Sequence, residues 1–135
     1  MFKMVKTLTA WWPVKVYEPD PEKPGQFVEF AFEAEFEILD RNDVKRNADE
    51  RAVIFAEAEQ TGADFDAIQQ RLEALELKIF QRTIRNWRGI VDDKDEVFPF
   101  TNENFLTAWS RTHIREGFGA AYAEAIDTGK ARLGN

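Results

Sequence analysis

The sequence is poor in the residues that build most enzyme and metal sites: among 135 residues it has no cysteine, one histidine and two methionines. Without cysteine, neither disulfides nor thiolate metal sites can form. His113 has no cysteine and no second histidine with which to build a nucleophilic triad or a zinc site. The glycines form no phosphate-binding motif. We therefore predict a protein that is not an enzyme and that holds no cofactor and no metal ion.

Long apolar runs are missing as well. No stretch approaches the roughly 18 apolar residues of a membrane span, and residues 1–6 lack the apolar run of a signal peptide. We expect a chain that is neither exported nor bound to a membrane. A length of 135 residues suits one domain, which we assign to residues 1–135.

Negative charge predominates and is unevenly distributed. The net charge of −7 is made up of +3 in residues 1–17, −7 in residues 18–40 and −3 in the remainder. A broad acidic surface repels phosphates, so nucleic acid is not expected as the main partner.

The acidic segment carries the clearest secondary-structure pattern. In residues 28–38 every even position is apolar, and four of the odd positions are glutamates: Glu29, Glu33, Glu35 and Glu37. A period of two predicts a strand with aromatic side chains on one face and glutamates on the other. Residues 14–17 also alternate, and residues 18–25 between them are rich in turn formers. Residues 1–40 are therefore predicted to form a β-hairpin.

Each face of this hairpin has more than one interpretation. The glutamate row is either the solvated face of an antiparallel sheet, an acidic docking stripe, or a device against edge-to-edge aggregation. The aromatic face, with Phe30, Phe32 and Phe36, needs a cover because two strands alone are marginal in water. Helices of the same chain are the first candidates for that cover, and a second subunit is the next.

Beyond residue 40 the pattern changes to helix. Asn42 or Asp43 is available to cap a first helix with one apolar face made of Val44, Ala48, Ala52, Phe55 and Ala56. Asp64 can cap a second helix, which is predicted to continue to Trp87 and to pack on a neighbouring helix through Phe65, Ile68, Leu72, Leu75 and Ile79. A last helix aligns Ile114, Phe118, Ala121, Tyr122 and Ala125, with Gly117 and Gly119 allowing close approach.

The pattern as a whole predicts an α+β fold. An N-terminal antiparallel β-hairpin packs on a mostly α-helical C-terminal part of about four helices, over residues 41–127. Residues 128–135 are expected to form a flexible tail.

Residues 87–122 are predicted to form a rigid corner. Gly89 can adopt the left-handed conformation that ends a helix, and an acidic turn follows at residues 92–96. Thr101 can cap the next helix, which places Phe100 and Phe105 at the two positions of a hydrophobic staple. The acidic turn lacks the ligand spacing of a calcium loop, so it is expected to stay solvated.

This corner resembles the phage tail assembly chaperones, small proteins of long-tailed bacteriophages. The resemblance lies in Trp87, Gly89 and Ile90, the acidic turn, the aromatic box of residues 98–104, and a final helix with Arg111 and the Ala121-Tyr122 pair. The N-terminal part is also similar, in residues 12–16 and 30–36. Together these segments extend over most of the chain.

The resemblance implies an assembly chaperone of the host cytoplasm that is absent from the mature virion. In that family the protein keeps the long tape-measure protein soluble while the tail tube polymerises around it. Exposed aromatic side chains rimmed by charge would suit such a client. The candidate contacts are Trp11, Trp12, Trp87, Phe98, Phe100 and Trp109, for each of which core packing is the alternative.

Further partners follow from the same resemblance. It implies a homo-oligomer, for which the hairpin offers an unpaired edge. A −1 ribosomal frameshift often gives this family a longer form that recruits the tail tube protein, and Gly129-Lys130 is a pair that a slippery sequence could encode.

Two other functions remain open from sequence. One is a structural tail-completion or connector protein that stays in the virion. The other is a host-directed acidic inhibitor that mimics DNA, suggested by the glutamate row.

Overall fold

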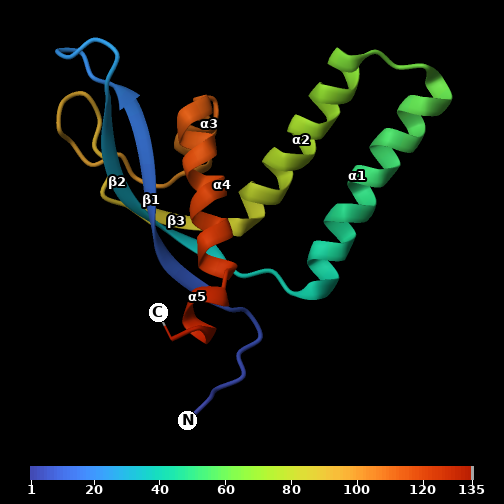
Figure 1. Ribbon diagram of the computed structural model, residues 1–135, viewed down its shortest axis with the longest axis horizontal. Helices are drawn as coiled ribbons and strands as arrows, with labels where there is room; N and C mark the ends of the chain where they lie inside the picture. Colours follow the sequence, from blue (N-terminus) through green and yellow to red (C-terminus); the bar gives the residue numbers. More distant parts are fainter. Residues whose placement is uncertain (135) are drawn as a thin grey trace. The chain divides into compact units, whose positions relative to one another are not determined.

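The computed structural model describes residues 1–134 and confirms the α+β fold (Figure 1). The chain forms two compact units that alternate along the sequence. The helical unit comprises Met1–Leu8 and Glu37–Thr83, and the sheet unit comprises Thr9–Phe36 and the residues from Ile84 onward. The elements are β1 (Thr9–Pro19), β2 (Phe27–Glu37), α1 (Arg41–Thr61), α2 (Phe65–Thr83), β3 (Ile84–Arg88), α3 (Asn102–Trp109), α4 (Thr112–Ile126) and α5 (Gly129–Arg132).

The predicted hairpin is present as β1 and β2. Its connecting loop is closed by a hydrogen bond from the Asp20 N–H to the Gln26 carbonyl, with 2.8 Å between N and O. The even positions of β2 face the core of the sheet unit as expected, because Phe32, Ala34 and Phe36 are buried. Phe30 continues the same face toward the turn but is 50% exposed.

A third strand replaces the end of the predicted second helix. The continuation of that helix through Ile84 to Trp87 was wrong: α2 ends at Thr83, and β3 pairs antiparallel with β2 in a sheet of order β1-β2-β3. Ala34 is opposite Trp87, and a bulge follows at Glu35 and Phe36. A local helical spacing of apolar residues could not reveal this, because the pairing with a strand some 50 residues earlier decides it.

Helix α4 covers the inner face of the sheet and makes the aromatic core. Figure 1 shows α4 crossing β1, against which it packs. Gly117 permits this approach, because a Cβ there would lie 2.8 Å from the Lys15 carbonyl oxygen. The fully buried Phe118 ring then has its centroid within 6.4 Å of four other rings, those of Phe32, Trp87, Phe105 and Trp109.

Helices α1 and α2 form an antiparallel pair in the helical unit (Figure 1). Asp64 caps α2 as predicted, accepting a hydrogen bond from the Ala67 N–H at 2.9 Å. The first helix differs from the prediction in two ways. Its N-cap is Asp40 rather than Asn42 or Asp43, and Asp40 accepts from the Asp43 N–H at 2.9 Å.

The buried face of α1 also differs from the apolar face of the sequence pattern. Ile54 and Ala58 are its buried residues, whereas Val44 is 55% and Phe55 54% exposed. The apolar face of the sequence pattern is thus not the face that contacts α2. The contacting side of α1 presents only Ile54 and Ala58 as buried apolar residues, together with several polar residues, a pattern with weak amphipathicity. On α2 the predicted face is confirmed for Leu75, which is buried, while Phe65 is 75% exposed.

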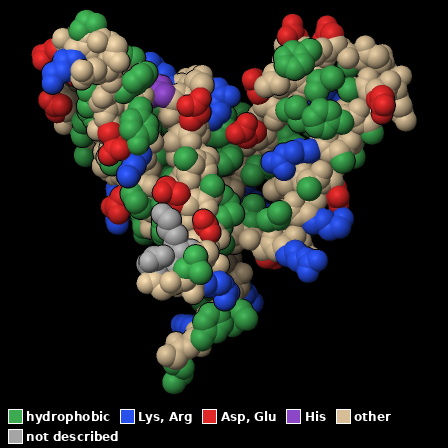
Figure 2. Space-filling view, viewed as in Figure 1, with side chains coloured by type: hydrophobic (Ala, Val, Ile, Leu, Met, Phe, Trp, Pro, Cys, Tyr) green, Lys and Arg blue, Asp and Glu red, His purple; other side chains and the backbone are tan. Residues whose placement is uncertain are grey.

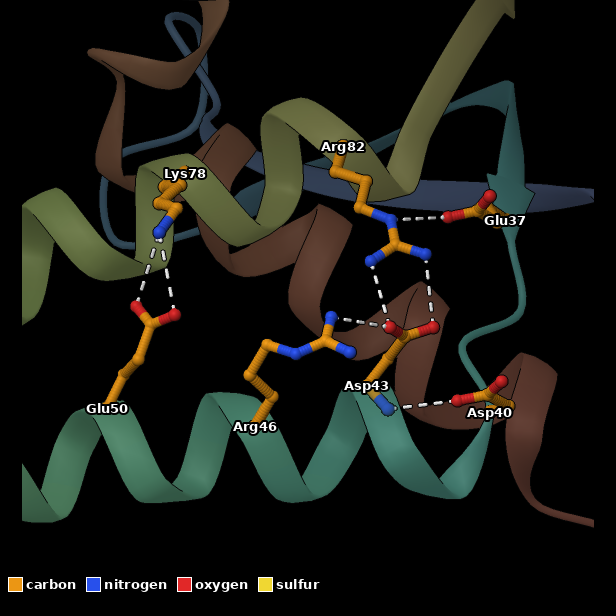
Figure 3. A network of polar contacts seen from close by, with 7 residues as sticks. All are labelled: Glu37, Asp40, Asp43, Arg46, Glu50, Lys78 and Arg82. Carbon is orange, nitrogen blue, oxygen red and sulfur yellow. Dashed lines mark hydrogen bonds and ion pairs between the residues drawn. The ribbon is translucent and has the colours of Figure 1, made fainter.

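Ion pairs add to this thin apolar contact (Figure 3). The guanidinium of Arg82 on α2 donates two hydrogen bonds to the Asp43 carboxylate, at 3.0 Å each, and one to Glu37, at 2.9 Å. The hydrogen bonds from Arg82 hold the pKa of Asp43 below its usual value of 3.8. Lys78 and Glu50 form a further pair at 3.3 Å between α2 and α1.

The C-terminal segment contains a short helical turn. Residues 129–132 form α5, where a flexible tail was expected over residues 128–135. Asn135 lies outside the described residues. Both the flexibility of this tail and the single-domain assignment over residues 1–135 stay predictions.

Candidate functional site

The corner that carries the family resemblance is held by side-chain hydrogen bonds to the backbone. Thr101 caps α3 as predicted, because its Oγ1 accepts from the Asn104 N–H at 3.0 Å. Asn104 also donates through Nδ2 to the Pro99 carbonyl at 2.8 Å, a contact that the sequence pattern alone did not reveal. The two bonds join the extended approach to the first turn of the helix, so the chain direction is fixed there.

The aromatic box packs around Trp87. Its indole N–H donates to the Phe98 carbonyl at 2.9 Å, and its ring is stacked with Phe98 at a centroid separation of 6.0 Å. Phe100 meets Trp87 edge to face at 5.0 Å, and contacts Phe105 at 6.1 Å. The contact of Phe100 with Phe105 is the predicted hydrophobic staple.

Gly89 has the positive φ that was predicted, at 89°, although it ends β3 rather than a helix. Beyond it, Val91 and Val97 form an isolated bridge that closes the acidic turn. The Asp92 carboxylate accepts from the backbone N–H groups of Lys94 and Glu96, at 2.8 and 3.0 Å. The acidic turn is therefore held by hydrogen bonds between its own Asp92 side chain and its own backbone.

Between this loop, the hairpin and helices α3 and α4 lies an apolar groove of about 680 Å³, entirely within the sheet unit. Its walls continue the aromatic core outward, since buried Val16 and Phe32 lie beside the half-exposed Phe30. Further apolar lining comes from Ile90, Val91, Phe98, Ala108 and Ile114. The strand face that α4 leaves uncovered thus becomes the floor of an open site.

Charged groups of both signs stand at the groove. The Glu18 carboxylate and His113 Nε2 lie 2.7 Å apart, which makes an ion pair when the imidazole is protonated. Asp93 and Arg111 also line the groove, and neither forms an ion pair among the described residues. The site can therefore accept an apolar side chain together with an acidic and a basic group of a partner.

The outer face of the sheet carries the predicted glutamate row, where several members are paired. Arg88 on β3 donates to Glu33 at 2.9 Å, and its guanidinium lies 4.1 Å from the centre of the Trp11 ring. Tyr17 donates to Glu29 at 2.9 Å, and this hydrogen bond raises the pKa of Tyr17. Glu29 and Glu33 are therefore part of a cross-strand network on the solvated face, whereas Glu37, at the end of the row, is only 8% exposed and pairs with Arg82.

The six aromatic residues proposed as partner contacts divide by burial. Trp87 and Trp109 are 4% and 6% exposed and belong to the aromatic core. The remaining four, Trp11, Trp12, Phe98 and Phe100, are partly exposed, and among the six only Phe98 lines the groove. Phe30 lines it as well, and its place at the end of an apolar strand face was the sequence feature that could have indicated it.

The residues that the structure describes contain no cluster of three or more histidine, cysteine, aspartate or glutamate side chains arranged to hold a metal ion. Within the same residues, no helix has the length and apolar character needed to cross a membrane. Comparison of the chain with models of known families, with curated proteins and with solved structures finds no match.

Proposed function

We propose that the protein is a phage tail assembly chaperone that binds the tape-measure protein in the host cytoplasm and is absent from the mature virion. The observation that carries the proposal is the apolar groove beside the corner of residues 87–122, the segment in which the sequence resembles that family. An amphipathic helix of the client would place an apolar side chain against Phe30 and Phe98. Its own charged residues would pair with Asp93 and Arg111.

The chemistry of the groove suits temporary binding. One groove of this size admits a few side chains of a client helix, so each contact is weak, and a long helical client offers the same contact many times. Charged groups at the groove keep an unoccupied chaperone from associating indiscriminately.

Co-expression with a tape-measure fragment tests the proposal. The fragment should stay in the supernatant with the native chain and should precipitate with Phe30→Ser. Phe27→Ser is the matched control, since Phe27 is a 68% exposed phenylalanine of the same strand that does not line the groove. A fragment that precipitates with the native chain as fully as with Phe30→Ser would refute the chaperone assignment.

Mass spectrometry of purified virions separates the chaperone from its alternative. A tail-completion or connector protein would be present in stoichiometric amounts, whereas an assembly chaperone would be missing.

A longer form belongs to the same proposal. A −1 frameshift at the codons of Gly129-Lys130 would append an extension that recruits the tail tube protein. The nucleotide sequence at these codons and the downstream reading frame test it directly.

A further inference from the structure

Helix α1 has a second apolar stripe, on a side that α2 does not cover. Val44, Ala48, Ala52 and Phe55 follow each other at spacings of four, four and three residues, so they share one face of the helix. All four are exposed, with Val44 at 55% and Phe55 at 54%. Figure 2 shows hydrophobic side chains exposed among charged ones over α1 and α2.

The two ends of this stripe carry opposite charges. Arg41 precedes Val44 by three residues and Glu59 follows Phe55 by four, so both lie on the stripe. Among the described residues neither side chain forms an ion pair or a side-chain hydrogen bond. Each charge also opposes the helix dipole, which favours acids in the first turn and bases in the last. These charges therefore do not stabilise their own helix.

We infer that the stripe pairs with the same stripe of a second copy of this chain, in antiparallel orientation. Arg41 with Glu59 and Ala48 with Ala52 are symmetric about residue 50, and Val44 with Phe55 nearly so. Arg41 of one copy therefore lies opposite Glu59 of the other, and the reverse. Val44 then meets Phe55 of the second copy at both ends. Ala48 and Ala52 lie at the centre, where their small side chains let the helices approach closely.

A parallel arrangement is disfavoured by the same charges. It would place Arg41 against Arg41 and Glu59 against Glu59, and like charges in direct opposition destabilise a helix pair. Antiparallel pairing replaces both repulsions by attractions and also opposes the two helix dipoles favourably.

The contact is small, and its affinity is correspondingly low. The stripe from Val44 to Phe55 spans about 16 Å of helix. A contact of this length buries less than the total surface of about 1,200 Å² that is typical of a stable dimer. Arg51 lowers the affinity further, because its position beside the stripe brings it near the Arg51 of the other copy. The pair therefore forms at high local concentration, as when several copies gather on one client; this use rests on the proposed function, whereas the contact itself does not.

Charge exchange on the isolated full-length chain tests the pairing. Sedimentation over a concentration series should show a weak dimer for the native chain. Arg41→Glu and Glu59→Arg should each weaken it about tenfold or more, because each places like charges at both ends of the pair. An equimolar mixture of the two variants should dimerise again, since both ends of a mixed pair then place a glutamate opposite an arginine.

Weakening by each single exchange together with restoration in the mixture is specific to antiparallel self-pairing, because a parallel pair already opposes like charges at both ends and gains no new repulsion from either exchange. Dimerisation unaffected by either exchange, as expected for pairing through the edge of the sheet or through another face, would overturn the inference. So would two weakened variants that fail to associate when mixed, or a native chain that stays monomeric at all concentrations.

An apolar substitution provides the second measurement. Phe55→Ser should remove the dimer, whereas Val53→Ser, at a 51% exposed valine on the other side of α1, should leave it intact. Helical circular dichroism of each variant checks that the fold persists. The solubility of the tape-measure fragment is measured separately. If the Phe55→Ser monomer still keeps the fragment soluble, self-pairing and client binding are distinct. If the native chain forms dimers but does not keep the fragment soluble, only the proposed function fails.

Discussion

The sheet unit and the helical unit are stabilised by different interactions. The sheet unit buries a cluster of aromatic rings around Phe118, while the buried apolar residues of the helical unit are Ile54, Ala58 and Leu75. Ion pairs centred on Arg82 supplement that short list. Apolar burial depends little on pH and salt, whereas exposed ion pairs depend on both. The comparison indicates that one unit provides a rigid scaffold and the other a conditionally stable pair of helices.

The largest expected effect is the loss of the central ring. Phe118→Ala should lower the free energy of unfolding by about 3–5 kcal/mol, because it removes contacts with four rings and leaves a cavity. Leu75→Ala should cost about 2 kcal/mol, near the lower end for such changes, since Leu75 lines an open groove of about 500 Å³ where water is already close.

Urea unfolding followed by two probes measures this difference. All four tryptophans lie in the sheet unit, so their fluorescence reports on that unit, while helical circular dichroism also reports on α1 and α2. Equal losses of unfolding free energy for Phe118→Ala and Leu75→Ala would show that the two units depend on apolar burial to the same degree.

The second effect concerns the close packing of helix α4 against strand β1. Gly117→Ala should destabilise the protein by about 1–3 kcal/mol, because the new Cβ would lie 2.8 Å from the Lys15 carbonyl oxygen and 2.9 Å from Val16. Gly119→Ala is the control, since a Cβ there meets nothing within 4 Å, and it should be neutral or stabilising by up to about 1 kcal/mol. Thermal unfolding of both variants tests the pair, and a costly Gly119→Ala would contradict the packing.

The smallest effect should appear on acidification of the helical unit. The pKa of Asp43 is lower in the folded chain than its usual value of 3.8, because Arg82 donates hydrogen bonds to the carboxylate. The resulting stabilisation is fully present above pH 3.8 and is lost as the pH falls through the lower folded value. Arg82→Gln should therefore be less stable than the native chain at pH 6, and this difference should shrink below about pH 4.

Helical circular dichroism in urea at each pH measures this difference. Arg51→Gln serves as the control, because Arg51 forms no ion pair among the described residues. A difference between Arg82→Gln and the native chain that is constant with pH would show that the ion pair does not contribute.

Local patterns predicted much of the sheet unit. The alternation in β2, the cap at Thr101, the staple of Phe100 with Phe105 and the positive φ of Gly89 each depend on residues close in sequence. The groove was not predictable in the same way. It requires the hairpin, the loop after β3 and helix α4 to meet, and no short window contains all three.

The errors have a common origin in long-range contacts. Ile84 and Trp87 fit a helical spacing, yet pairing with β2 made their segment a strand. On α1, the apolar positions of the sequence identified a real stripe, but ion pairs from Arg82 and Lys78 and the small contact at Ile54 determined which side faces α2. The stripe that remained exposed is the one that we assign to a second copy.

The element types over most of the chain, the caps and turns, and the absence of cysteine chemistry could be predicted from the sequence, because they follow from side chains and their nearest neighbours. The core positions of Trp87 and Trp109, the place of Phe30 in a groove and the exposure of Phe55 depend instead on how distant segments pack. The burial of a side chain depends on which segments distant in sequence pack against it, and its sequence neighbours do not indicate which segments those are.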